Sequence, residues 1–190
     1  MIDMLAHMVG LYRNGWNFVA IVLLCIVAAI CYGIAHDSIT VRMSREYFTV
    51  LHPQLLDDDA PAWQLALLWG TIATWWVGLI LGTIVAFTAN WGVSRPVMKA
   101  ARLVKPVATL LVAMAVCAAI AGCIGYAVAS GSPDMFPRLT RILPGEVIVP
   151  TIAVAFAHNA SYLSGGIGGI VLAIWCWRKR GQRPDGISPS

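Results

Sequence analysis

The sequence predicts an all-α, polytopic membrane protein, a bundle of four transmembrane helices preceded by a short N-terminal amphipathic helix. Hydrophobic residues make up 59% of the 190 residues and charged residues only 12%, about half the charged fraction of an ordinary soluble domain. The apolar residues gather in four runs, each of roughly 20 residues or more, the length that crosses a bilayer. Basic residues lie beside these runs, which favours contact with anionic lipid headgroups and argues against nucleic-acid binding.

The first 15 residues carry apolar and polar side chains on opposite faces at helical spacing. This pattern predicts a helix along the membrane surface that ends at Asn14-Gly15. The first span then covers about residues 16–35, with Trp16 at the interface. Because its apolar segment is longer than that of a signal peptide and no small-residue cleavage site follows, we expect this segment to be retained.

Three further spans are expected at about residues 63–91, 104–129 and 150–177. The stretch before His158 would be either a helix that projects beyond the membrane or an entry kinked at Pro150. Each span carries small residues four positions apart, which allow helices to pack closely. These small-residue stripes are Cys25, Ala29 and Gly33; Gly70, Thr74, Gly78 and Gly82; Ala121, Gly125 and Ala129; and Ser161, Gly165, Gly169 and Ala173.

The connection from His36 to Ala60 holds most of the polar residues between the first two spans. Its β-branched segment Ile39–Met43 predicts poor helicity. Ser44 is placed to cap a short helical turn that stops before the next proline. The aspartates 57–59 and Pro61 predict the start of the second span, because acidic caps and a first-turn proline favour a helix N-terminus. These contiguous aspartates lack the alternate spacing of a calcium loop.

Lysine and arginine define the expected topology. Nine of the 13 basic residues belong to the side that holds both termini, and four belong to the other, so the positive-inside rule places both termini in the cytoplasm. Residues 1–180 would form a single membrane domain, and residues 181–190 a disordered cytoplasmic tail. The nine are Arg13, Arg95, Lys99, Arg102, Lys105, Arg178, Lys179, Arg180 and Arg183, and the four are Arg42, Arg45, Arg138 and Arg141.

Threading the spans brings three histidines to the outer face. His36 ends the first span, and His158 stands at the outer end of the hydrophobic part of the last one. Glu46 and His52 follow in the connection. Neutral imidazoles with a carboxylate suit zinc, iron or copper, so His36, Glu46, His52 and His158 are a candidate metal site, and three ligands with an open position would make it catalytic. The residues expected to surround and orient these ligands are Asp37, Tyr32, Tyr126, Tyr162 and Asn159.

The spacing of these residues is not diagnostic of a metal, because the chain has no H-E-x-x-H motif, no histidine pair four residues apart and no EF-hand loop. One alternative is a structural or accessory subunit, with Glu46 paired to Arg42 or Arg45 and a partner or second copy bound through the small-residue stripes. Another is a haem held by His36 and His158. Transport is least supported, because no charge lies at mid-bilayer and no inverted repeat is evident.

Two other groups of residues have a simpler interpretation. The five cysteines lie within or beside apolar runs and form no C-x-x-C motif, which favours small reduced core residues over disulfides or thiol exchange. Trp69, Trp75 and Trp76 lie deep in the second span. They would contact lipid or a quinone-like ligand, and packing with lipid is the favoured interpretation.

Three segments of the chain resemble those of a group of uncharacterised four-span bacterial membrane proteins. They are His36-Asp37…Thr40…Arg42…Glu46-Tyr-Phe-Thr…His52-Pro53, the run from Trp69 to Gly78, and Ser161-Tyr-Leu-Ser-Gly-Gly-Ile-Gly-Gly169. The resemblance covers most of the chain. It implies a four-span architecture in a bacterial inner membrane, and it assigns no activity and no catalytic residue.

Overall fold

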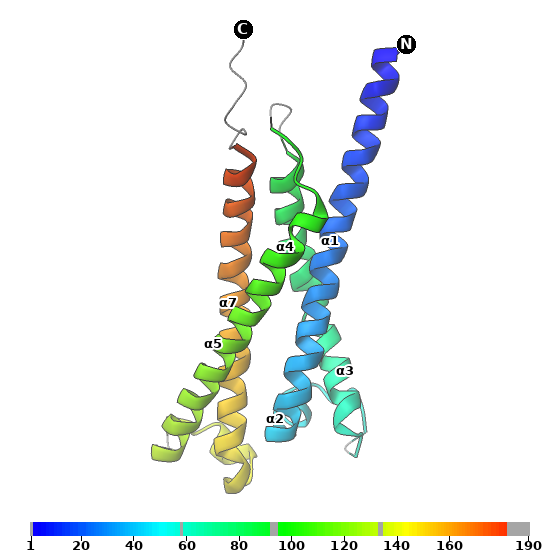
Figure 1. Cartoon of the computed structure of the whole chain (residues 1–190). Coiled ribbons are helices and arrows are strands. Elements are labelled where there is room, and N and C mark those ends of the chain that lie inside the picture. The colour runs from blue at the N-terminus through cyan, green and yellow to red at the C-terminus, as the bar shows by residue number, and fades with distance from the viewer. Residues whose placement is uncertain (1, 58, 92–94, 133–134, 182–190) are drawn as a thin grey trace.

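The protein is an all-α bundle in a computed structural model that describes residues 2–57, 59–91, 95–132 and 135–181, with side chains from Gly15 onward. Four stretches are long and apolar enough to cross a membrane, which confirms the predicted four-helix membrane fold. The helices, shown in Figure 1, are α1 (Ile2–Met43), α2 (Glu46–Thr49), α3 (Ala62–Ile72), α4 (Trp75–Asn90), the 3-10 turn η1 (Ala100–Arg102), α5 (Val104–Gly131), α6 (Leu139–Ile142) and α7 (Gly145–Gly181).

Helix α1 is longer than the first predicted span at both ends. It runs without interruption through Asn14-Gly15, so residues 2–15 extend the first membrane helix. A single internal glycine costs only about 1 kcal/mol, which a long apolar helix tolerates. The helix also continues from His36 to Met43, where weak helicity was expected. Thr40 and Val41 are each 4% exposed there, and their burial outweighs the few tenths of a kcal/mol that β-branching costs.

The second span is divided into two helices instead of one. Helix α3 ends at Ile72 and α4 begins at Trp75. The amide of Thr74 donates to Thr71 O at 3.3 Å, one residue short of helical spacing, and its hydroxyl donates to Gly70 O at 2.5 Å. A threonine side chain that bonds to the preceding turn in this way competes with the backbone ladder. Thr74 is therefore the breakpoint of the span as well as a member of its small-residue stripe.

The helix termini agree with the sequence expectations in some places and differ in others. The Tyr47 amide donates to Ser44 Oγ at 3.3 Å, as expected of a capping serine. Helix α3 begins after Pro61 and has no side-chain cap, so the aspartates do not cap it, although Asp58 lies outside the described residues. Helix α7 is continuous through Pro150, where a proline so near the N-terminus removes one hydrogen bond. The predicted tail, residues 182–190, lies outside the described part of the chain.

The small-residue stripes of the first two spans face each other within the chain. A Cβ atom on Gly70 would lie 2.5 Å from the backbone nitrogen of Ile34, and one on Gly78 would lie 2.7 Å from Cys25 O. Helix α1 packs mainly against α3 and α4, and α5 packs mainly against α7. In the second pair, a Cβ on Gly125 would lie 2.7 Å from the Phe156 ring. The stripes thus hold the chain's own helices together.

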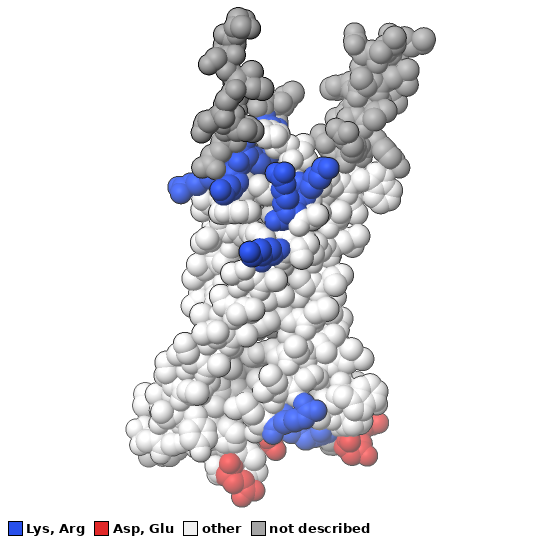
Figure 2. Space-filling view, viewed as in Figure 1, with Lys and Arg blue, Asp and Glu red and all other residues white. Residues whose placement is uncertain are grey.

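Basic residues gather at the end of the bundle where α4 meets α5 and α7 ends, which we call the basic end (Figure 2). Polar side chains tie this end together. The Asn17 amide group donates to Asn90 Oδ1 and Met98 O and accepts from the Ala100 amide. Arg180 is 3% exposed and donates to Pro96 O at 2.7 Å, Thr88 O at 2.5 Å and Arg95 O at 3.3 Å. Arg180 therefore satisfies carbonyls of α4 and its following loop.

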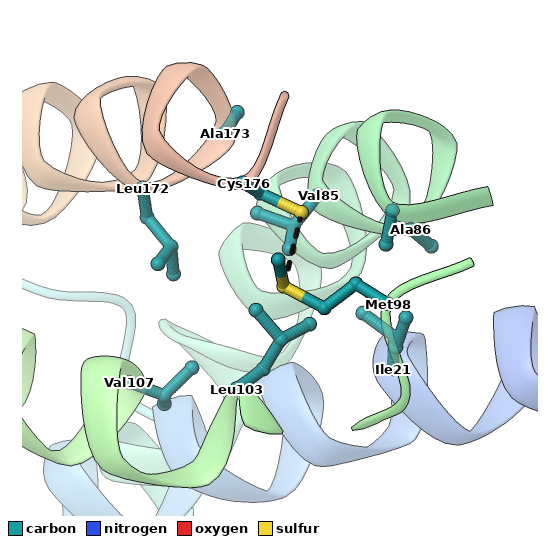
Figure 3. Packing of buried hydrophobic residues seen from close by; sticks show 10 residues of the cluster. Ile21, Val85, Ala86, Met98, Leu103, Val107, Leu172, Ala173 and Cys176 are labelled. Atoms are coloured by element: carbon teal, nitrogen blue, oxygen red, sulfur yellow. Dashed lines mark hydrogen bonds between the residues drawn. The ribbon is translucent and has the colours of Figure 1, made fainter. Parts of the chain in front are cut away.

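An apolar cluster lies directly beneath these hydrogen bonds. Figure 3 shows Met98 reaching from the loop toward Cys176, with Sγ and Sδ atoms 3.6 Å apart. Ile21 from α1, Val85 and Ala86 from α4, and Leu172 and Ala173 from α7 surround the pair. Cys176 is fully buried in this cluster, as a core cysteine was expected to be, whereas Cys31, Cys117 and Cys123 are exposed.

We expect Arg180→Lys to destabilise the protein by about 2 kcal/mol, because an ammonium group cannot reach three carbonyls that the guanidinium fork contacts together. Thermal unfolding followed by tryptophan fluorescence in detergent would measure the change. Arg178→Lys is the matched control, since Arg178 is exposed in the same turn. Equal unfolding temperatures for the two variants would contradict this role of Arg180.

Candidate metal centre

Two histidines and one aspartate meet between α1 and α7. His36 and Asp37 come from α1 and His158 from α7, and one ligand atom from each lies within 4.8 Å of the others. Asp37 is 4% exposed and His158 8% exposed. We call these three residues the triad. It can form only because α1 continues as a helix past Ala35, which turns His36 and Asp37 toward α7.

The distances within the triad fit two ligands of a shared cation better than a hydrogen bond. His158 Nε2 lies 3.6 Å from Asp37 Oδ1, which is too long for a hydrogen bond. Two ligands bound tetrahedrally to zinc at about 2.1 Å lie about 3.4 Å apart, and no two ligands of one ion exceed about 4.2 Å. The largest separation within the triad is at most 4.8 Å, so the three atoms would have to approach one another by up to about 1.4 Å to bind a tetrahedral zinc.

Two polar groups of the triad lack partners that would offset the free-energy cost of burying them. His36 Nε2 is a buried nitrogen with no hydrogen-bond partner in the part of the chain that the structure describes. Asp37 is a buried carboxyl group 3.6 Å from His158 Nε2, a ring that carries a charge only when it is protonated. A buried charge of this kind costs several kcal/mol unless an opposite charge or several hydrogen bonds offset it. A bound cation would supply both the missing charge and the missing partner.

A small cavity adjoins the triad. Its volume is about 50 Å³, enough for an ion together with bound water. All three residues of the triad line it, and so do Ala73 and Thr74 at the break between α3 and α4. The break between α3 and α4 therefore forms part of the cavity wall. The other polar side chains in its wall are Tyr32, Ser161 and Tyr162.

The histidine of α7 is held in place by neighbours from α1 and α2. Thr40 Oγ1 lies 3.1 Å from His36 O and 3.2 Å from His158 Nε2. The hydroxyl donates its hydrogen to the carbonyl, so in the metal-free protein it accepts one from Nε2–H of His158. The Tyr47 ring packs against His158 with centroids 4.5 Å apart. Burial, followed by the nearby Tyr162 and Asp37, raises the pKa of the Tyr47 phenol above its ordinary value of 10.0, so this ring is neutral.

The four predicted ligands fall into two groups. His36 and His158 meet, with ring centroids 4.5 Å apart. His52 instead lies against Trp69 at 4.7 Å, and its Nδ1 lies 2.7 Å from the carbonyl of Tyr47. Glu46 Oε2 accepts from Ser44 Oγ at 3.3 Å. Neither His52 nor Glu46 belongs to the triad, and Asp37, expected behind the ligands, takes the carboxylate position.

The supporting residues that the sequence suggested also separate. Tyr32 and Tyr162 line the cavity, and the Tyr32 hydroxyl lies 2.8 Å from Ser161 Oγ. Tyr126 is 56% exposed and lines a different groove. Asn159 is exposed and donates to Ala155 O within its own helix.

Contacts in the structure bear on two alternatives raised by the sequence: an ion pair between Glu46 and an arginine, and a haem held by His36 and His158. Arg42 donates to Ser38 O and Arg45 donates to Ala60 O, so both arginines bond to backbone carbonyls.

The rings of His36 and His158 are 4.5 Å apart. Axial histidines on a haem iron would have centroids roughly 6 Å apart with the porphyrin between them. The two rings are therefore too close, in this arrangement, to hold a haem.

Thr40, Tyr47 and Ser161 are neighbours of the triad or of its cavity that the sequence did not assign to the site. Thr40 lies four residues after His36, on the same face of a continued helix. Extending the first span by two turns would have revealed it. Tyr47 carries no such signal, because its position depends on how α2 folds back over α7.

Comparison of the chain with protein-family models, curated proteins and solved structures finds no match.

Proposed function

We propose that the protein is an integral membrane metalloprotein in which His36, Asp37 and His158 bind a transition metal. The observation that carries this proposal is the approach of two imidazoles and one carboxylate to within 4.8 Å, with His36 Nε2 unpartnered in the described structure. The metal would offset the cost of burying Asp37. It would leave an open position toward the cavity of about 50 Å³.

The ligand chemistry favours zinc, iron or copper. Imidazole suits all three metals, and two histidines with one carboxylate and open positions form the ligand set of non-haem Fe(II) oxygenases. Three protein ligands with water in a fourth position form the ligand set of catalytic zinc sites, where the metal lowers the pKa of the bound water. Binding requires a lone pair on His158 Nε2, so the imidazole would carry its hydrogen on Nδ1 and the metal would replace the hydrogen bond to Thr40.

We also propose that both termini face the cytoplasm of a bacterium and that the triad lies on the outer side of the inner membrane. The support is the gathering of basic residues at one end of the bundle (Figure 2) and the positive-inside rule. His36 is seven residues from the end of α1 at Met43, about 10 Å along the helix. The centre would therefore lie within the outer leaflet, close to the headgroups.

The test is the metal content of the purified protein. We expect one equivalent of zinc per chain after incubation with zinc and removal of the excess, measured by elemental analysis. His52→Ala and Glu46→Gln should keep that equivalent, since neither side chain belongs to the triad. Absence of stoichiometric zinc, iron and copper from the wild type would contradict the proposal. Loss of zinc in His52→Ala or Glu46→Gln would instead locate the site in the connection after α1.

A further inference from the structure

A long groove separates α1 from α5 at the end opposite the basic end. Its volume is about 600 Å³, within the range of sites for small organic ligands. Figure 1 shows α1 and α5 diverging toward this end. The walls are Tyr32, Ala35, His36, Ile39 and Met43 of α1; Ala115, Ala118, Ala119, Gly122, Cys123 and Tyr126 of α5; and Ala157 of α7.

The groove opens sideways, toward the surroundings of the bundle. Ile39 is 65% exposed, Tyr126 56% and Met43 48%. In a membrane these side chains face lipid, so the groove fills with something largely apolar. Its wall on α5 consists largely of alanine and glycine, and such short side chains leave the space open.

The length of the groove corresponds to one leaflet of a bilayer. Its walls run from Tyr32 to Met43 and from Ala115 to Tyr126, and each wall is about 16 Å long at the helical rise per residue. The hydrocarbon core is about 30 Å thick, so the groove is about half as long as the core, with its Tyr32 end in the hydrocarbon and its Met43 end near the headgroups. A helix from a second copy fits poorly, because a single helical turn with its side chains takes roughly 400 Å³.

The groove and the cavity of the triad share two residues, Tyr32 and His36. These side chains form the wall between the two spaces. Polar groups in the groove are confined to Tyr32, His36 and Tyr126. A lipid of the outer leaflet would keep its polar head at the outer end, near Tyr126 and Met43, and would lay its acyl chain along α5 past His36 and Tyr32.

We infer that the groove binds one acyl chain of a membrane lipid from the leaflet around the triad, and that acyl lipids are the class of molecule presented to the metal centre. The second part rests on the proposed function. The first part does not, because the groove exists whether or not a metal is bound. The lipid enters sideways from the bilayer and needs no aqueous path.

Photocrosslinking of a lipid tests the inference. The protein is placed in nanodiscs of phosphatidylethanolamine and phosphatidylglycerol that contain a small fraction of phosphatidylglycerol with a diazirine midway along one acyl chain. After illumination, mass spectrometry gives the labelling of each residue of α5. Ala115, Ala119 and Cys123 line the groove, and Val112, Val116 and Ile120 are exposed residues of the same helix outside it. The second set therefore reports ordinary lipid contact.

We expect groove residues to be labelled more than the exposed set and Ala119→Phe to lower that excess about tenfold (about 1.4 kcal/mol), a change within the range of overpacking penalties. Ala113→Phe is the matched control, because Ala113 is exposed on α5 and does not line the groove. Equal labelling of both sets overturns the inference, as does an excess that survives Ala119→Phe. A crosslink between two copies through the groove overturns it as well.

Zinc content, measured on the same samples, separates this result from the proposed function. Labelled groove residues with no bound metal would support the lipid site and reject the metal centre. Bound metal together with equal labelling of the two sets would support the metal centre and reject the lipid site.

Discussion

Replacing Asp37 with asparagine is expected to stabilise the metal-free protein and to abolish its stabilisation by zinc. Asp37 is 4% exposed and its carboxyl group lies 3.6 Å from His158 Nε2, so removing the charge relieves a desolvation cost of about 2 kcal/mol. The unfolding temperature of the metal-free variant should rise by about 5 °C. With zinc, the wild type should gain about 2.7 kcal/mol at 100 times the dissociation constant, and the variant almost nothing.

The measurement is thermal unfolding by tryptophan fluorescence, with chelator or with zinc. Zinc affinity should fall at least 100-fold in Asp37→Asn, more than the 10- to 100-fold typical of residues that merely support a ligand. Asp59→Asn is the control, since Asp59 is exposed near the same end of the bundle. A destabilised metal-free Asp37→Asn, or zinc stabilisation that persists in it, would show that Asp37 is a structural group.

Gly70→Ala is expected to separate α3 from α1. The added Cβ would lie 2.5 Å from the backbone nitrogen and 2.6 Å from the Cα of Ile34. Backbone atoms cannot rotate aside as a side chain can, so one helix must move. We expect a loss of about 3 kcal/mol, at the upper end of overpacking penalties, and an unfolding temperature lower by about 10 °C.

Gly166→Ala gives the matched comparison, because a Cβ on Gly166 meets nothing within 4 Å. That variant should be neutral or slightly more stable, since alanine is the better helix former. The two variants can be compared by fluorescence unfolding and by resistance to sodium dodecyl sulfate. If Gly70→Ala unfolds at the same temperature as Gly166→Ala, the close approach of α1 and α3 does not stabilise the fold.

Most of the fold could be predicted from the sequence, because membrane spans depend on local composition. The third span was placed at residues 104–129 and α5 runs from Val104 to Gly131. The existence and order of the spans follow from the long apolar runs, whereas some helix ends, such as Met43 of α1, do not. The small-residue stripes are also visible in short stretches of sequence, so close contacts between helices could be predicted without knowing which helices pair.

The features that could not be predicted depend on contacts between distant segments. The break at Thr74 lies in an unbroken apolar run, and it coincides with a Cβ-free surface on α1, where a Cβ on Gly33 would lie 2.6 Å from Thr74 Cγ2. The continuation of α1 to Met43 likewise depends on burial of Val41 against α3 and on Thr40 meeting His158. Propensity alone favours the opposite result at Ile39–Met43.

The candidate site likewise has one part that the sequence could predict and one part that depends on contacts between distant segments. Depth in the membrane is a property of each span, so the meeting of His36 with His158 could be anticipated from the sequence. Which carboxylate joins them depends on rotation about the helix axis. Once α1 continues, Asp37 turns toward α7, whereas Glu46 lies in a separate short helix beside Ser44. The two turns by which α1 continues therefore bring Asp37, and not Glu46, beside the two histidines.

The contacts at the two ends of the bundle bear on the width of the groove between α1 and α5. Asn17 and Arg180 tie α1 and α7 to the segment that joins α4 to α5, and the Arg95 guanidinium lies 4.0 Å above the Trp177 ring. Helices α1 and α7 are also joined near the opposite end, where the Ser44 and Thr151 hydroxyl oxygens lie 2.7 Å apart. Helix α5 packs mainly against α7, so the width of the groove beside His36 depends on how α5 leans on α7 and away from α1.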